Sequence, residues 1–133
     1  MRPTLFSLTL LLSVIALGCE PAPADQARVH GTVTVNGRPL RGGTIVFVPD
    51  RQRGNRGDVA QAAVGEDGRF ELRGKHGMGA VPGWHRITVA PRPDAADLVQ
   101  RMEKFRYPDQ SGLTREVKAG TDNSFDIHIE LEQ

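Results

Sequence analysis

Four histidines are the side chains of this sequence best suited to bind a metal ion or to transfer protons: His30, His76, His85 and His128. A metal site needs several ligands that converge with fixed geometry, and no two of these histidines have a spacing typical of metal ligands. His30 and His128 fall on the polar side of strand-like segments, so they are expected at the surface. His85 lies on the apolar side of its segment and is expected to be hydrogen-bonded and partly buried. We therefore expect no metal ion and no other cofactor.

The most highly charged local segment carries Arg51, Arg53 and Arg56. Guanidinium groups bind oxyanions well, so these arginines are candidate contacts for an anionic polysaccharide or a lipid headgroup. Asp50 and Asp58 flank the segment and reduce the field that it projects. The alternative interpretation, which the flanking acids favour, is a solvated hairpin loop without a ligand.

Trp84, the only tryptophan, precedes a strand-like segment. An exposed indole can stack on a sugar ring, whereas a buried one fills the core. Trp84 is therefore a candidate ligand contact, with packing as the favoured alternative.

No arrangement for nucleophilic catalysis is evident in the sequence. Ser111 lies in Ser-Gly-Leu, which does not match the nucleophile elbow of hydrolases, and no spacing suggests a pairing of histidine with aspartate. We expect no catalytic residues and no enzymatic activity. A hydrolase of small substrates is the alternative from another functional class.

The N-terminus has the pattern of a signal peptide. A basic start is followed by an almost wholly apolar run from Leu5 to Leu17, which is shorter than the roughly 20 residues of a membrane-spanning helix. The run ends in Ala16-Leu17-Gly18 before Cys19, the single cysteine. This resembles the lipobox of bacterial lipoproteins, although Ala16 stands where leucine is usual. The resemblance implies removal of residues 1–18, lipidation of Cys19 and an extracytoplasmic, membrane-anchored protein. Plain secretion with a free Cys19, or an uncleaved anchor, is the alternative.

Charge and length describe the part that would remain after cleavage. Without residues 1–18, of which Arg2 is the only charged one, Lys plus Arg falls from 17 to 16 and equals the 16 Asp plus Glu. A chain without surplus positive charge is poorly suited to nucleic acid, because that binding depends on neutralising phosphates. Residues 19–27, which include the lipidated cysteine, form a polar, proline-containing linker, and residues 28–133 have the length of one ordinary domain.

Alternation of apolar and polar residues predicts strands through most of this domain. Asn36-Gly37 and Asp67-Gly68 are strong signals for tight turns between strands. The segment 73–83 is rich in glycine and is predicted to be a loop. Seven strands are predicted, over residues 28–35, 44–48, 59–64, 69–72, 84–90, 113–117 and 124–131.

One helical stretch interrupts this pattern. Leu98, Met102 and Phe105 recur at helical spacing, Asp94 is a suitable N-terminal cap, and Pro108 ends the stretch. Together, these elements predict an all-β fold, a seven-stranded antiparallel sandwich with one short helix before the last two strands.

Several motifs, taken in order, resemble the carboxypeptidase regulatory-like, or transthyretin-like, domain of small bacterial envelope lipoproteins. The residues that carry this resemblance are 33–40 (VTVNGRPL), 42–49 (GGTIVFVP), 67–70 (DGRF), Pro82-Gly83, Tyr107, 111–114 (SGLT) and the strand around Phe125. Trp84-His85 departs from the family, which more often has tyrosine there. The resemblance covers nearly all of residues 28–133 and implies a Greek-key sandwich that acts as a structural or binding module.

Some enzymes have related sandwich folds, and the sequence lacks the sets of functional residues that these enzymes use. Ureide hydrolases end in a Tyr-Arg-Gly-Ser-type tail, whereas this chain ends in Glu-Leu-Glu-Gln. Intradiol dioxygenases bind iron through two tyrosines and two histidines, and Tyr107 is the only tyrosine here. The resemblance therefore implies a non-enzymatic module whose candidate partners, besides the membrane itself, are cell-wall glycan or another envelope protein.

Overall fold

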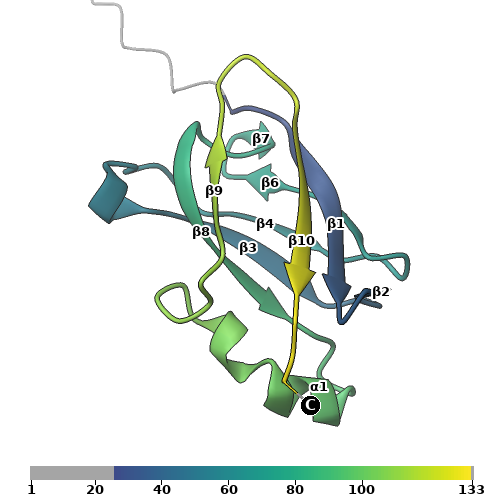
Figure 1. Ribbon diagram of the computed structural model, residues 1–133. Coiled ribbons are helices and arrows are strands. Elements are labelled where there is room, and N and C mark those ends of the chain that lie inside the picture. The colour runs from purple at the N-terminus through teal and green to yellow at the C-terminus, as the bar shows by residue number, and fades with distance from the viewer. Residues whose placement is uncertain (1–25, 133) are drawn as a thin grey trace, which may run out of the picture.

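The segments with alternating apolar and polar residues form the strands of two β-sheets in the computed structural model, which describes residues 26–132 (Figure 1). Each of the seven predicted strands has a counterpart. These are β1 (Val29–Val35), β3 (Thr44–Pro49), β4 (Ala60–Ala63), β5 (Arg69–Glu71), β8 (Gly83–Ala90), β9 (Thr114–Val117) and β10 (Asn123–Ile129). Three further strands are only two residues long: β2 (Arg38–Pro39), β6 (Arg73–Gly74) and β7 (Gly77–Met78).

The two sheets differ in size and in strand direction. In the larger sheet the strand order is β7-β6-β4-β3-β8-β9, and all of the pairs are antiparallel. In the smaller sheet β1 lies between β10 on one side and β2 and β5 on the other. The pair of β1 with β10 is parallel, so the prediction of a purely antiparallel sandwich is wrong at this point. The two strands are remote in sequence, and no tight turn fixes their relative direction.

Gly31 is a residue of β1 at which β10 lies too close to leave room for a side chain. It pairs in register with Phe125. A Cβ atom at position 31 would overlap the carbonyl oxygen of Phe125, which is a backbone atom and cannot move unless the strands separate. Glycine at this position therefore allows the parallel pair to form.

The core lies between the sheets and is built by the inward-facing residues of both. β1 contributes Val29 and Val33, and the facing strand β3 contributes Ile45 and Phe47, all of them fully buried. The Phe47 ring lies near the centre of this core, where its centroid is 5.7–6.3 Å from those of Phe70, His85 and Phe125. Burial of such side chains is the main favourable term in folding.

The helical stretch covers one end of the sandwich. α1 (Ala96–Arg101) is followed by the 3-10 turn η2 (Glu103–Arg106), and the predicted apolar stripe is confirmed because Met102 and Phe105 are buried. The prediction that Asp94 caps this helix is wrong. The cap position is Ala95, without a side-chain hydrogen bond, and the Asp94 carboxylate instead binds the guanidinium group of Arg92.

The segment 73–83 is also more ordered than predicted, because β6 and β7 form a small hairpin within it. Gln26, at the start of the described chain, holds this hairpin. Its side-chain amide donates to the carbonyl groups of Gly77 and Gly79 at 3.1 and 3.2 Å, and its carbonyl oxygen accepts the His76 backbone N–H at 3.0 Å. The chain thus enters the sandwich at a fixed place.

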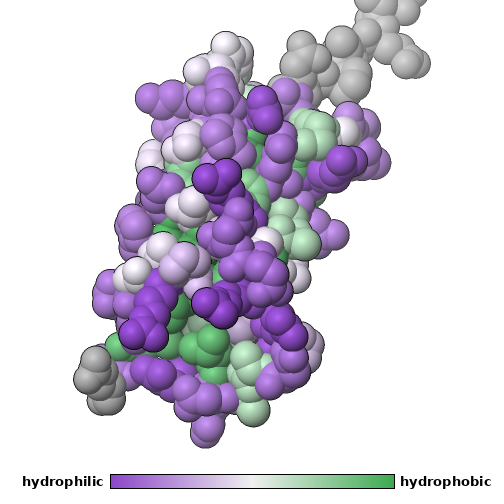
Figure 2. Space-filling model, turned by 90° about the vertical axis from the view of Figure 1, so that its right-hand side faces the viewer, coloured by the Kyte–Doolittle hydropathy of each residue, from purple (hydrophilic) through white to green (hydrophobic). Residues whose placement is uncertain are grey.

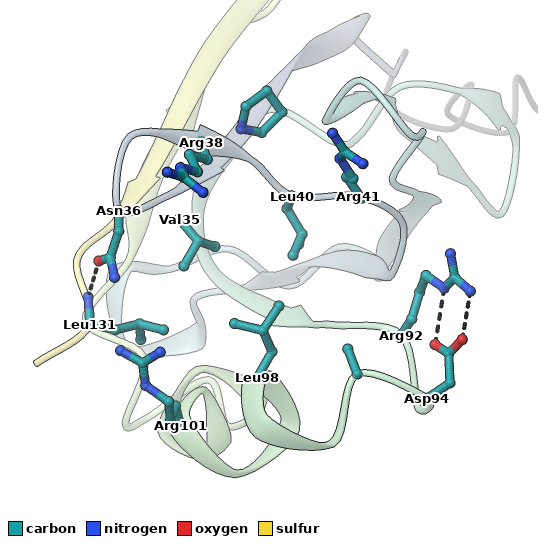
Figure 3. Close-up of a pocket in the computed structure, with 12 residues that line it drawn as sticks. Val35, Asn36, Arg38, Leu40, Arg41, Arg92, Asp94, Leu98, Arg101 and Leu131 are labelled. Carbon is teal, nitrogen blue, oxygen red and sulfur yellow. Dashed lines mark hydrogen bonds and ion pairs between the residues drawn. The ribbon is translucent and has the colours of Figure 1, made fainter. Parts of the chain in front are cut away.

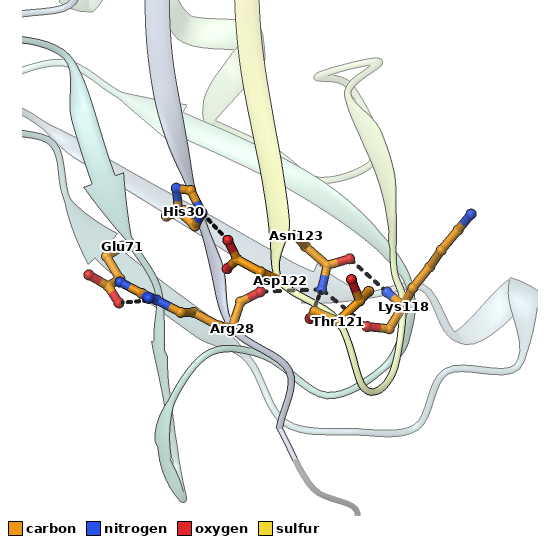
Figure 4. Close-up of polar contacts among 7 residues, drawn as sticks. All are labelled: Arg28, His30, Glu71, Lys118, Thr121, Asp122 and Asn123. Carbon is orange, nitrogen blue, oxygen red and sulfur yellow. Dashed lines mark hydrogen bonds and ion pairs between the residues drawn. The ribbon is translucent and has the colours of Figure 1, made fainter.

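A second set of contacts ties the start of β1 to the turn before β10 (Figure 4). The amide nitrogen of buried Asn123 donates to the carbonyl groups of Arg28, Lys118 and Thr121 at 3.1–3.2 Å, and its oxygen accepts the Lys118 N–H at 2.9 Å. We call this end of the sandwich, defined by Gln26, Arg28 and the turn 118–122, the entry end. The opposite end of β1 carries the β1–β2 turn and lies near α1 (Figure 1).

Candidate functional site

A groove of about 760 Å³ lies between the connection from β1 to β3 and helix α1 (Figure 3). We call it the arginine groove. Four of its twelve lining residues are arginines, and only one is acidic. Its volume is within the range of ligand-binding sites. The lining residues are Val35, Asn36, Arg38, Pro39, Leu40, Arg41, Arg92, Asp94, Ala95, Leu98, Arg101 and Leu131.

The floor of the arginine groove is apolar. Val35, Leu40 and Leu131 belong to the buried core, and half-buried Leu98 packs against it from α1. In Figure 3 the side chains of Leu40 and Leu98 point toward each other across the groove. Figure 2 shows the side of the molecule that is at the right in Figure 1. In its lower part, apolar side chains are bordered by hydrophilic residues. The groove therefore offers an apolar strip between charged rims.

The upper rim is a turn that the backbone holds firmly. Asn36 and Gly37 both have positive φ, as the tight-turn signal predicts. The Asn36 side-chain oxygen accepts a hydrogen bond from the Leu131 backbone N–H at 2.8 Å. The backbone N–H of Asn36 donates to the Ile129 carbonyl, also at 2.8 Å. The Leu40 N–H donates to the Val33 carbonyl at 2.9 Å, so the segment that carries the rim arginines is fixed on both sides.

Two of the four arginines already have anionic partners. Arg92 donates two hydrogen bonds to Asp94, at 3.0 and 2.6 Å, and lies 3.4 Å from a Glu66 oxygen. These contacts raise the pKa of Arg92, and the hydrogen bond from Arg92 lowers the pKa of Asp94. Arg101 pairs with Asp97 at 3.4 Å.

The other two arginines have no such partner in the part of the chain that the structure describes. Within residues 26–132, no carboxylate oxygen lies within 4.0 Å of the Arg38 or the Arg41 guanidinium group. Both residues are exposed. Their positive charges are available to an anionic ligand, which guanidinium groups bind in a planar, bidentate manner.

The ligand-contact residues predicted from sequence lie at a different place, and the structure brings two of them together. The Arg53 guanidinium carbon lies 4.3 Å from the centroid of the Trp84 ring. Buried Asp50 lies 3.6 Å from Arg53 and 3.4 Å from Arg86, and its backbone N–H donates to the Trp84 carbonyl at 2.9 Å. Arg53 therefore covers part of the half-buried indole, and the contact resembles the packing alternative more than an open sugar platform.

Arg51 and Arg53 form the 3-10 turn η1 (Arg51–Arg53), and Arg56 follows it. Both Arg51 and Arg56 are exposed, and among the described residues neither forms an ion pair. Cys19, the predicted lipidation site, lies outside the described residues.

The histidines are distributed over the molecule. His30 pairs with Asp122 at 2.8 Å, and His76 lies 4.0 Å from Asp58. His128 is hydrogen-bonded through Nδ1 to the Thr34 hydroxyl at 2.6 Å, on the exposed side of the smaller sheet. Within residues 26–132, no group of three His, Cys, Asp or Glu side chains is placed to hold a metal ion.

His85 is buried and hydrogen-bonded, as its position in the sequence predicts. Its Nδ1–H donates to the Gly83 carbonyl at 3.0 Å, while Nε2 has no hydrogen-bond partner in the described part of the chain. Burial lowers the pKa of His85, and the bond to Gly83 opposes this shift only in part. The imidazole is thus neutral in the folded protein at neutral pH.

We expect His85 to make the protein less stable in acid. The folded-state pKa lies below that of the unfolded chain, about 6.5, so the unfolded chain binds a proton that the folded chain does not. The stability that neutral His85 contributes should be fully present well above pH 6.5 and should be lost as the pH falls below it. Urea denaturation of wild type and of His85→Phe at several pH values between about 5 and 8 measures this. An equal pH dependence in both proteins would contradict it.

The arginine groove was not predicted from sequence. Its four arginines come from three separate segments, the β1–β3 connection, the residues just after β8 and the end of α1. The only signal was the tight turn at 36–37 followed by Arg38 and Arg41. That α1 would lie opposite this turn could not be derived from local patterns.

In comparisons with known proteins, no family model, no curated protein and no solved structure matches the chain. The resemblance to the carboxypeptidase regulatory-like domain therefore stays a prediction. No helix within residues 26–132 is long and apolar enough to span a membrane.

Proposed function

We propose that the chain is a non-enzymatic binding module of the cell envelope, anchored to a membrane through a lipidated Cys19. In this proposal residues 1–18 are a signal peptide, and the sandwich is a transthyretin-like, carboxypeptidase regulatory-like domain. Residues 19–27 are a tether whose last two residues, Gln26 and Ala27, are already hydrogen-bonded to the sandwich. The arginine groove is the surface presented to a partner.

The observation that carries this proposal is the position of the groove relative to the entry end. The tether joins the sandwich at Gln26, next to the start of β1, whereas the groove begins at Val35, where β1 ends. The strand between them rises about 3.3 Å per residue. An anchor at the entry end would therefore direct the groove away from the membrane.

The length of the tether limits how far the sandwich can move. Seven residue steps separate Cys19 from Gln26 and span at most about 25 Å when fully extended. Gln26 and Asn123 fix the start of the described chain to the entry end of the sandwich. A membrane anchor at Cys19 would therefore hold the entry end close to the lipid surface.

The chemistry of the groove suits binding and not catalysis. Among the described residues, no serine, cysteine, histidine or lysine lines it, so these residues offer no nucleophile and no group that exchanges protons near neutral pH. Its one carboxylate, Asp94, is held by Arg92 in two hydrogen bonds. Arginine remains protonated and can only attract and orient an anion.

Two single-cysteine labels test the proposed orientation. Thr121→Cys lies in an exposed turn at the entry end, and Gln100→Cys lies on the exposed side of α1 beside the groove. With Cys19 acylated, a thiol-reactive fluorophore labels only the new cysteine. In liposomes that contain lipids with a headgroup quencher, we expect strong quenching at position 121 and weak quenching at position 100. Equal quenching, the reverse order, or no quenching at either position would contradict the proposal.

A further inference from the structure

We propose that the arginine groove binds an acidic peptide segment of a partner protein in which an apolar side chain lies between acidic residues. This inference rests on the binding role proposed above. It adds the chemical class of the ligand and the residues that recognise it.

The arrangement of charge along the groove carries this inference. In Figure 3, Arg38 and Arg101 lie toward the end marked by Leu131, and Arg41 and Arg92 lie toward the opposite end. Leu40 and Leu98 lie between the two pairs. The order of features along the groove is thus positive, apolar, positive. A segment with the order acidic, apolar, acidic is its complement.

Each end of the groove has one arginine free to bind a ligand anion. Among the described residues, Arg38 and Arg41 have no carboxylate within 4.0 Å, whereas Arg92 is neutralised by Asp94 and Glu66. The Arg101 guanidinium also donates to the Glu132 carbonyl at 3.2 Å, which holds it beside the groove. Arg38 and Arg41 are thus the two lining arginines without an acidic partner in the described part of the chain, so a ligand with two carboxylates is expected.

Other ligand classes fit the groove less well. No aromatic side chain of residues 26–132 lines it, so a neutral sugar would lack a stacking surface there. A small inorganic anion would use one end and leave the apolar strip exposed to water. A purely apolar ligand would remove water from guanidinium groups without replacing their hydrogen bonds. Lipid headgroups of the anchoring membrane would lie at the entry end, away from the groove.

The test measures binding of a rhodamine-labelled peptide, Ser-Glu-Asp-Leu-Glu-Asp-Ser, to the full-length protein in lipid nanodiscs by fluorescence anisotropy. We expect Arg38→Gln and Arg41→Gln each to weaken binding on the order of tenfold, because each removes a charge-assisted contact. Arg56→Gln is the matched control. It changes an equally exposed arginine without an ion pair, in the loop after η1, and should leave the affinity unchanged.

The peptide itself supplies the second half of the test. A peptide with amides in place of its carboxylates should not bind, and one with asparagine in place of leucine should bind several-fold more weakly. Raising the salt from about 50 to about 500 mM should also weaken binding, since exposed charges are screened. Circular dichroism confirms that each variant is folded.

Three results would overturn the inference. They are no binding at millimolar peptide, an equal loss in Arg56→Gln, and competition by the small dicarboxylate suberate at the same concentration as unlabelled peptide. The last result would identify a small dicarboxylate site. None of these results affects the quenching at position 121, so failure of this inference is distinguishable from failure of the membrane anchor.

Discussion

Replacing Ile127 with alanine should lower the free energy of unfolding by roughly 2–5 kcal/mol. Ile127 is fully buried in β10 and pairs in register with Val33 of β1. The substitution removes three carbon atoms from a packed interior, and the rigid parallel pair limits how far the surroundings can collapse into the space. Since a domain of this size is stable by about 5–15 kcal/mol, the loss is large. Urea denaturation followed by Trp84 fluorescence measures it.

His128→Ala is the control, because His128 is the next residue of the same strand and faces the opposite side. It is exposed, and its one hydrogen bond, to Thr34, lies at the surface. Loss of such a bond should cost at most about 1 kcal/mol. A cost for His128→Ala equal to that for Ile127→Ala would show that the alternation of this strand is reversed, or that His128 binds a ligand.

Local patterns were sufficient to predict which residues face the core. Val33 and Ile127 stand at apolar positions of the alternating segments 28–35 and 124–131, and both are fully buried. Alternation works here because a strand sends successive side chains to opposite sides whatever its neighbours are. For the same reason, alternation contains no information about the relative direction of two paired strands. The parallel pairing of β1 with β10 was therefore not predicted.

Errors in the helical region and in the segment 73–83 have a common cause, which is competition between local and remote partners. Asp94 has the right type and position for a helix cap, but Arg92 lies two residues away and binds its carboxylate. The glycine-rich segment has weak strand propensity, yet the Gln26 side chain, about fifty residues earlier, holds its backbone in a hairpin. Neither partner could be inferred from the pattern of the segment itself.

The candidate site shows the same limit. Arg51, Arg53 and Arg56 are close together in sequence and were the obvious candidate cluster. In the structure, however, Arg53 forms an ion pair with Asp50 and packs over the Trp84 ring. Arg38, Arg41, Arg92 and Arg101 converge only after the β1–β2 turn and α1 meet at one end of the sandwich. A site built from three remote segments depends on tertiary packing, which periodicity does not encode.

Cys19→Ala should abolish acylation completely, and this is the largest effect that we expect on cellular behaviour. Acyl chains supply the anchor: each buried methylene contributes about 0.8 kcal/mol, and stable attachment needs more than a single chain. No other cysteine can substitute, since Cys19 is the only one in the chain. Wild type should enter the detergent phase on Triton X-114 separation because of these chains. Processing of the variant before residue 19 should fail as well, because the lipobox resemblance makes cleavage depend on the modified cysteine.

The intact mass of the protein purified from membranes tests the central claim most directly. The proposal predicts a wild-type chain that begins at Cys19, lacks residues 1–18 and carries the added mass of acyl chains. It predicts that Cys19→Ala, purified in parallel, carries no acyl mass and retains residues 1–18. A wild-type chain with an unmodified Cys19, or a variant cleaved at the same position as wild type, would contradict the lipid-anchored module.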